Sequence, residues 1–170
     1  MDGTTPISET WVQAVPPDWH MVGTGDFNGD GKADILWQNV NGSVAIWEMN
    51  GTSPIAQSVV QVVTPDWHVV GTGDFNADGK ADILWQNVNG SVAIWEMNGT
   101  TPIAETVVQA VTPDWHVVGT GDFNADGKAD IVWQNAASGQ AAVWLMNGTS
   151  PTLETLVGQA PGPDWHLLAG

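Results

Sequence analysis

The sequence predicts an all-β protein made of tandem units, and three observations lead to this prediction. The segment 16–52 recurs almost unchanged as 64–100, and a more diverged copy spans 112–149. The 20 Gly and 10 Pro residues interrupt every window with a helical period, so no helix is expected. Short alternations of apolar and polar residues end at Asn-Gly pairs, which is typical of strands joined by tight hairpins.

The repeat has a period of about 48 residues. The tripeptide Asp-Trp-His starts at Asp18, Asp66, Asp114 and Asp164, so successive copies are 48, 48 and 50 residues apart. The whole chain reads as one segment, residues 1–170, with about three and a half units. Their approximate bounds are 1–48, 49–96 and 97–145, followed by a half unit at 146–170.

Each unit is expected to contain four strands, which the middle unit illustrates in order. The first strand covers 67–72 and ends before an acidic loop, and the second covers 81–87, where apolar residues alternate between two faces. An Asn-Gly turn leads into the third strand at 92–97. The fourth strand runs from 103 to 111 and ends at a Thr-Pro pair.

Four short antiparallel strands at this period match one blade of a β-propeller. The alternative is a β-solenoid, whose shorter rungs pair in parallel and do not suit tight Asn-Gly hairpins. The predicted fold class is therefore all-β, a β-propeller built of four-stranded antiparallel blades.

Composition excludes several functions. There are 19 acidic residues against 3 basic ones, for a net charge of −16, which disfavours binding to nucleic acid or to an anionic membrane. The absence of Cys excludes disulfides and thiolate sites. No apolar run approaches the ~20 residues of a membrane span, so no membrane insertion is expected. The polar start, Met1–Thr5, is no signal peptide, and an export signal would lie upstream.

An acidic loop recurs at 26–34, 74–82 and 122–130, with the pattern D-x-N-x-D-G-x-x-D. Oxygen side chains at positions 1, 3, 5 and 9, with a Gly at position 6 for the bend, are typical of calcium-binding loops. The Lys at position 7 offers only its backbone carbonyl to a metal. The predicted metal ligands are Asp26, Asn28, Asp30, Lys32, Asp34, Asp74, Asn76, Asp78, Lys80, Asp82, Asp122, Asn124, Asp126, Lys128 and Asp130.

Calcium is the predicted cofactor, with about three ions per chain. Hard oxygen ligands without His or Cys favour calcium over zinc or copper. The loop is not an EF-hand, because its position 12 is Trp37, Trp85 or Trp133 instead of Glu. The alternative is a metal-free Asp/Asn/Gly turn, but three carboxylates in each nine-residue loop would repel each other without a cation.

The phrase from Gly23 to Asn39, Gly-Thr-Gly-Asp-Phe-Asn-Gly-Asp-Gly-Lys-Ala-Asp-Ile-Leu-Trp-Gln-Asn, resembles the FG-GAP/VCBS repeats of bacterial secreted proteins and of integrin α-subunit propellers. The resemblance covers essentially the whole chain. It implies that the acidic loop joins the first and second strands of a blade and holds one calcium. Asn28, Asn76 and Asn124 depart from the Asp that is frequent at position 3, which removes one charge from each site.

Catalysis is not expected. The Asp-Trp-His tripeptide recurs in every unit, which suits a turn entering the first strand better than a catalytic site. Strand tryptophans such as Trp37 and Trp47 could stack on sugar rings, but the core between blades is the expected place for them. Trp19 and its equivalents are better candidates for partial exposure.

The predicted function is a calcium-binding propeller module for recognition or adhesion, extracellular, secreted or at the cell surface, with calcium in a structural role. The alternatives are a carbohydrate-binding lectin and a non-catalytic accessory segment of a larger secreted enzyme. A glycan or a protein would be the ligand. A homodimer or other homo-oligomer through open blade edges is also expected, because the first-strand segment 165–170 and the fourth-strand segment 7–15 lack strands between them.

Overall fold

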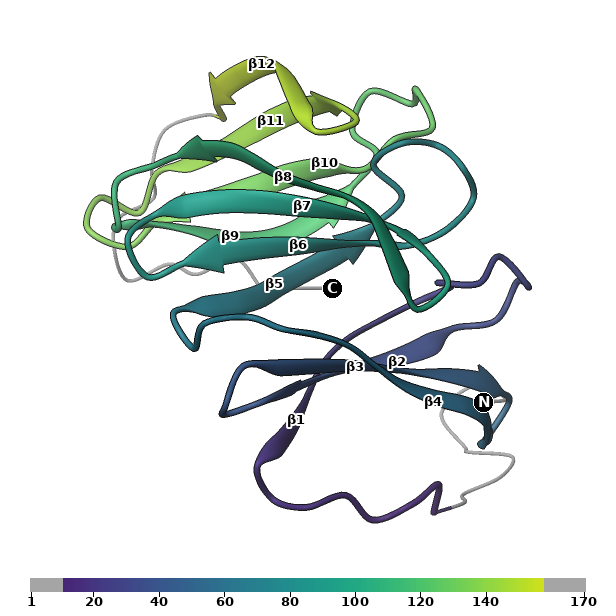
Figure 1. The fold of residues 1–170 in the computed structure, drawn as a ribbon. Coiled ribbons are helices and arrows are strands. Elements are labelled where there is room, and N and C mark those ends of the chain that lie inside the picture. Colours follow the sequence, from purple (N-terminus) through teal and green to yellow (C-terminus); the bar gives the residue numbers. More distant parts are fainter. Residues whose placement is uncertain (1–10, 158–170) are drawn as a thin grey trace, which may run out of the picture.

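The computed structural model describes residues 11–157, and within this range it contains β-strands and turns only. Three four-stranded antiparallel sheets follow one another, each with its strands in chain order (Figure 1). The strands are β1 (Trp19–Gly25), β2 (Asp34–Asn39), β3 (Ser43–Asn50) and β4 (Ser53–Val62); β5 (Trp67–Gly73), β6 (Asp82–Asn87), β7 (Ser91–Asn98) and β8 (Thr101–Ala110); and β9 (Trp115–Gly121), β10 (Asp130–Asn135), β11 (Ala141–Asn147) and β12 (Ser150–Leu156).

These elements confirm the all-β prediction and the four strands expected per unit. The expected bounds for the middle unit agree with β5 to β8 to within about two residues. The expected unit bounds near 48, 96 and 145 fall inside β3, β7 and β11. The expected fourth-strand segment 7–15 is not a strand over 11–15, and its remaining residues lie outside the described part, as does the segment 165–170.

The hairpins between second and third strands form as the Asn-Gly pairs predict. In the middle sheet the Asn87 side chain accepts a hydrogen bond from the Asn89 amide (3.0 Å), and the Asn89 side chain accepts one from the Ser91 amide (2.8 Å). Gly90 has φ +90°, and its carbonyl accepts a hydrogen bond from the Val111 amide at 2.9 Å. This turn therefore also holds the chain that leaves β8.

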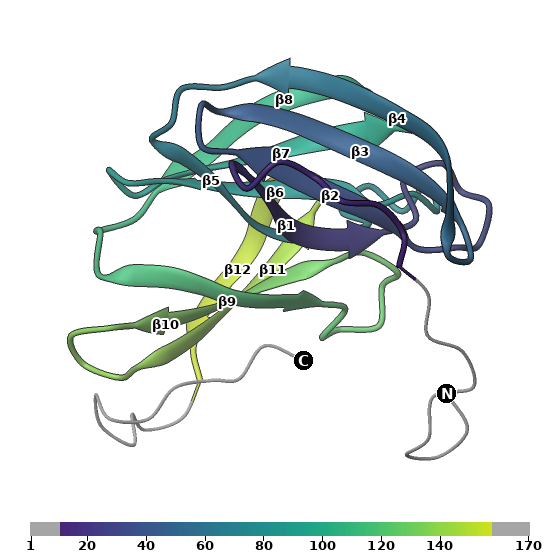
Figure 2. The same ribbon diagram turned by 90° about the horizontal axis from the view of Figure 1, so that it is seen from below.

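The three sheets pack face to face, with β5–β8 between the other two. Contacts between sheets run chiefly through the first strands, β1 against β5 and β5 against β9, which lie next to one another (Figure 2). One apolar cluster joins the first sheet to the second, around Phe27 and Trp85, and an equivalent cluster joins the second to the third, around Phe75 and Trp133. Each unit thus completes its core only against its neighbour.

A buried glutamine bridges each pair of sheets, which the sequence did not indicate. Gln38 on β2 donates to the Trp67 carbonyl (2.7 Å) and accepts from the Val69 amide (3.1 Å). Gln86 repeats both bonds to the third sheet. The amide nitrogen and the amide oxygen of one glutamine thus each bond a backbone group of the next sheet. These hydrogen bonds compensate the cost of burying the glutamine side chain.

The strand tryptophans lie in the core, as predicted. Trp85 and Trp95 are buried, with ring centroids 4.8 Å apart and planes tilted by 48°. Equivalent pairs occur in the first and third sheets. Trp67, at the start of its strand, is only half-buried, which confirms that this set is the more exposed one.

Candidate metal centre

The acidic loops connect the first and second strand of each sheet, where the resemblance placed them. The first loop lies between β1 and β2, and the other two lie at the equivalent places in the second and third sheets. Because each loop sits at a sheet end, most of its side chains reach solvent while its last carboxylate enters the protein.

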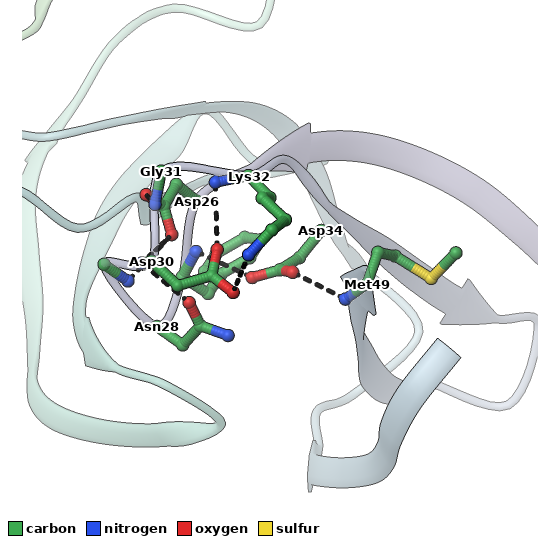
Figure 3. A network of polar contacts seen from close by, with 9 residues as sticks. Asp26, Asn28, Asp30, Gly31, Lys32, Asp34 and Met49 are labelled. Atoms are coloured by element: carbon green, nitrogen blue, oxygen red, sulfur yellow. Dashed lines mark hydrogen bonds and ion pairs between the residues drawn. The ribbon is translucent and has the colours of Figure 1, made fainter. Parts of the chain in front are cut away.

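The first carboxylate of the loop accepts the backbone of the turn. Asp26 Oδ1 accepts hydrogen bonds from the amides of Gly29 (2.7 Å) and Asp30 (3.1 Å), and Asp26 Oδ2 accepts one from Gly31 (2.7 Å). The Asn28 side-chain oxygen accepts from the Asp30 amide at 2.9 Å. Figure 3 shows these oxygens gathered around the turn. The bonds from the amides of Asp30 and Gly31 recur at the equivalent residues of the second and third loops.

The turn requires left-handed backbone at position 4. Gly29 has φ +77° there, but the equivalent residues Ala77 and Ala125 hold φ values of 62° and 60°. A left-handed alanine costs about 1–2 kcal/mol, so two of the three loops retain this conformation at an energetic cost. Strain of this kind is commonly found at ligand-binding turns.

The last carboxylate of the loop has a structural role that sequence analysis missed. Asp34 is fully buried; its Oδ2 accepts from the Phe27 amide (3.0 Å) and its Oδ1 from the Met49 amide (2.8 Å). Asp82 and Asp130 repeat both bonds. This residue fastens the loop to the third strand of its own sheet. This role becomes visible only once the structure shows that the Met49 amide lies next to the Asp34 side chain, which the sequence does not reveal.

The lysine at position 7 does more than offer its carbonyl. Lys32 Nζ lies 3.0 Å from Asp30 Oδ2, and Lys80 Nζ lies 3.9 Å from Asp78 Oδ2. The hydrogen bond from Lys32 lowers the pKa of Asp30. These ion pairs are exposed and contribute little to stability. One lysine in each loop cannot balance its three carboxylates.

Electrostatic repulsion is evident in the second loop. The pKa of Asp82 is raised to about 6, chiefly by burial and in smaller part by the charges of Asp78 and Asp74. Hydrogen bonds from the amides of Met97 and Phe75 act in the opposite direction but do not cancel the rise. In the third loop, by contrast, amide hydrogen bonds, first of all from Gly127, lower the pKa of the exposed Asp122.

In calcium-free protein we expect the raised pKa of Asp82 to make stability fall as pH rises. The folded-state pKa of about 6 lies above the ordinary aspartate value of 3.8, so the folded state binds more protons than the unfolded state between these pH values. Its contribution is complete below about pH 4 and is lost by about pH 6, which amounts to about 3 kcal/mol.

Urea unfolding at pH 4 to 6.5 measures this dependence. Asp82→Asn is the matched control, since it keeps the shape but removes the titration. A wild type and an Asp82→Asn variant with the same pH dependence would contradict the expectation.

The structure brings the first, third and fifth residues of each loop together around one turn and directs the ninth inward. Among residues 11–157 no group of three or more His, Asp or Glu side chains converges closely enough to form a ready-made metal site. The fifteen predicted calcium ligands therefore stay a prediction. Their chemistry fits a hard cation, because carboxylate, amide and carbonyl oxygens are the only donors present, and because the charge around Asp82 lacks compensation.

The chain is a tandem-repeat module: it consists of four-stranded antiparallel sheets that follow one another, and each sheet carries the same acidic loop. Two matches to the FG-GAP-like repeat family cover residues 26–85 and 74–133, which together exceed half of the chain. The chain belongs to the FG-GAP-like repeat family, as the resemblance predicted. Repeats of this family are typically non-catalytic, extracellular structural modules. No curated protein matches the chain. In the described part of the chain, no helix could span a membrane.

Proposed function

We propose that this chain is a calcium-stabilised module of the β-propeller type that serves recognition or adhesion outside the cell. The observation that carries the proposal is the acidic loop, repeated three times with the same hydrogen bonds and with more carboxylates than its single lysine can balance. Three successive four-stranded sheets, adjoining through their first strands, support blades of a propeller.

In the first loop, calcium would be held by the side chains of Asp26, Asn28, Asp30 and Asp34 and by the Lys32 carbonyl. Asp26 Oδ1 accepts two amide hydrogen bonds, but Asp26 Oδ2, Asn28 Oδ1 and both Asp34 oxygens each accept one and keep a second lone pair, so backbone bonding and metal binding are compatible at these atoms. When bound, the cation would neutralise the loop carboxylates and so remove their repulsion. The left-handed conformation of the turn is stabilised by the hydrogen bonds from the loop's own backbone amides to Asp26.

Titration calorimetry on calcium-depleted protein tests the proposal, with three ions per chain as the expected result. Asp78→Asn should reduce the number to two, because it weakens the middle loop alone. The matched control is Asp66→Asn, which makes the same charge change at an exposed residue outside the loops. A stoichiometry near zero in millimolar calcium would overturn the proposal.

One observation favours sugar binding as a second candidate function. Each of three equivalent hollows, of about 270 to 330 Å³, lies beside the tryptophans of one sheet. In the middle sheet the lining includes Trp67, Trp85 and Trp95, with Glu105 and Gln61 also present, and of the three rings only Trp67 is partly exposed. Aromatic surface suits the apolar face of a pyranose. A glycan array separates this function from protein adhesion.

A further inference from the structure

The three hollows beside the strand tryptophans differ in charge at one equivalent position. Glu105 on β8 and Glu154 on β12 line two of them, whereas Gln57 on β4 lines the third. Each of these residues lies directly opposite the third-strand tryptophan of its sheet, so the three positions correspond. We call the two charged sites the Glu105 hollow and the Glu154 hollow, and the uncharged site the Gln57 hollow.

The Glu105 hollow lies between the first and second sheets, with a volume of about 330 Å³. Residues 61–64, at the end of β4 and just after it, form one wall, and residues 105–107 on β8 form another. All of its lining residues lie between 61 and 107, so both walls belong to the part of the chain that the structure describes. The Glu154 hollow repeats this arrangement between the second and third sheets.

Aromatic rings and one small residue form the inner part of the Glu105 hollow. The buried rings of Trp85 and Trp95 pack with centroids 4.8 Å apart, and the partly exposed Trp67 lines the same hollow. Ala93 pairs with Trp85 across β6 and β7, at a place where a larger side chain would fill the space. The electron-rich face of an indole attracts a cation that comes within about 6 Å of the ring.

The Glu105 carboxylate has little to compensate its charge. Its Oε2 accepts a hydrogen bond from Gln61 Nε2 at 3.4 Å, close to the limit for such a bond, and Gln109 and Glu154 repeat this contact. All three lysines of the chain belong to acidic loops, and no lysine or histidine lines either charged hollow. These two hollows therefore favour a cation and disfavour phosphate or an acidic sugar.

We propose that the Glu105 and Glu154 hollows each bind an organic ammonium group. The tryptophan rings would contact its carbon atoms and attract its charge, and the glutamate would balance that charge. The net charge of −16 also attracts cations to the chain. Such a group occurs in choline-type quaternary ammonium compounds and in amino sugars. The proposal goes beyond the sugar-binding candidate, because a neutral sugar does not require a carboxylate without a counter-ion.

NMR titration of the 170-residue chain in millimolar calcium, at about pH 6, tests the proposal with choline and glucosamine as separate probes. In the wild type the indole signals of Trp67 and Trp115 should shift, whereas Trp19, in the Gln57 hollow, should respond only at about tenfold higher concentration, which corresponds to about 1.4 kcal/mol. Glu105→Gln should weaken the response of Trp67 alone by this factor. Gln57→Glu should strengthen the response of Trp19, because each substitution converts one kind of hollow into the other.

N-acetylglucosamine is the matched neutral ligand, because its nitrogen is acylated and carries no charge. It should bind the two charged hollows about tenfold more weakly than glucosamine does. A response to choline alone assigns a quaternary ammonium group, and a response to glucosamine alone assigns an amino sugar. A response to both supports the shared ammonium chemistry.

Glu48→Gln is the control variant, since it makes the same change at a half-buried glutamate of β3 that lines neither charged hollow. It should respond as the wild type does. Glu105→Gln and Gln57→Glu should both fold, because each introduces the residue that an equivalent sheet already carries. Three results would overturn the proposal: no response to either ammonium probe, equal affinity for glucosamine and its N-acetyl form, or an unchanged Trp67 response in Glu105→Gln. Calcium stoichiometry is a separate measurement, so the calcium proposal and this one fail independently.

Discussion

Removing calcium with a chelator should lower the melting temperature by roughly 20 °C. A ligand that binds only the folded state stabilises it by about 2.7 kcal/mol per site at a hundredfold excess over its dissociation constant. Three independent sites would therefore contribute about 8 kcal/mol, which is comparable with the whole stability of an ordinary domain. For a chain of this size each kcal/mol corresponds to about 2–4 °C. Calorimetric scans with calcium and with chelator measure the shift.

A triple variant shows whether the loops cause this shift. Asp30, Asp78 and Asp126 are changed together to Asn, which should abolish the response to chelator. The control changes Asp18, Asp66 and Asp114 to Asn, three exposed acidic residues outside the loops, with the same change in net charge. The control should respond as the wild type does. Equal melting temperatures with and without chelator in the wild type would contradict a structural role for calcium.

Gly90→Ala should destabilise the protein by about 4 kcal/mol or more, an effect at the upper end for single substitutions. The added Cβ would lie 2.0 Å from the Val111 carbonyl oxygen, far inside contact distance, and Gly90 has φ +90°. Because Val111 also donates its amide to the Gly90 carbonyl, the obstructing backbone is held in place. Urea unfolding in calcium measures the loss.

Gly51→Ala is the control that separates the cost of the clash with Val111 from the cost of a left-handed backbone. Gly51 also has a positive φ, +63°, but a Cβ there would meet nothing within 4 Å. Its cost should stay at the about 1–2 kcal/mol of a left-handed alanine. If Gly90→Ala and Gly51→Ala destabilise the protein equally, the contact with Val111 does not determine the effect.

Much of the fold could be predicted because its signals are local. The Asn-Gly pairs specify hairpins through the side chains of Asn87 and Asn89, which bond amides two residues away. The alternation in β6 predicts two buried faces, and both are found buried. The turn between the first and second strands could also be predicted, because its glycines and its oxygen-bearing side chains all lie within nine consecutive residues.

The rest depends on contacts that the repeat pattern does not reveal. Asp30 and Asp34 look equivalent in sequence, yet Asp34 is buried because Met49, on a strand that follows later, presents an amide to it. Gln38 reads as an ordinary polar residue on a strand, yet it joins two sheets.

The near-identity of the first two sheets has a consequence for folding kinetics. β3 pairs with β4 in the same register as β7 with β8, with Trp47 opposite Gln57 and Trp95 opposite Glu105. A misfolded chain in which β4 pairs with β7 would gain almost the same contacts. It differs mainly in closing a longer loop, which costs roughly 2 kcal/mol more in chain entropy. Short-range closure, rather than side-chain identity, therefore separates the native pairing from this kinetic trap.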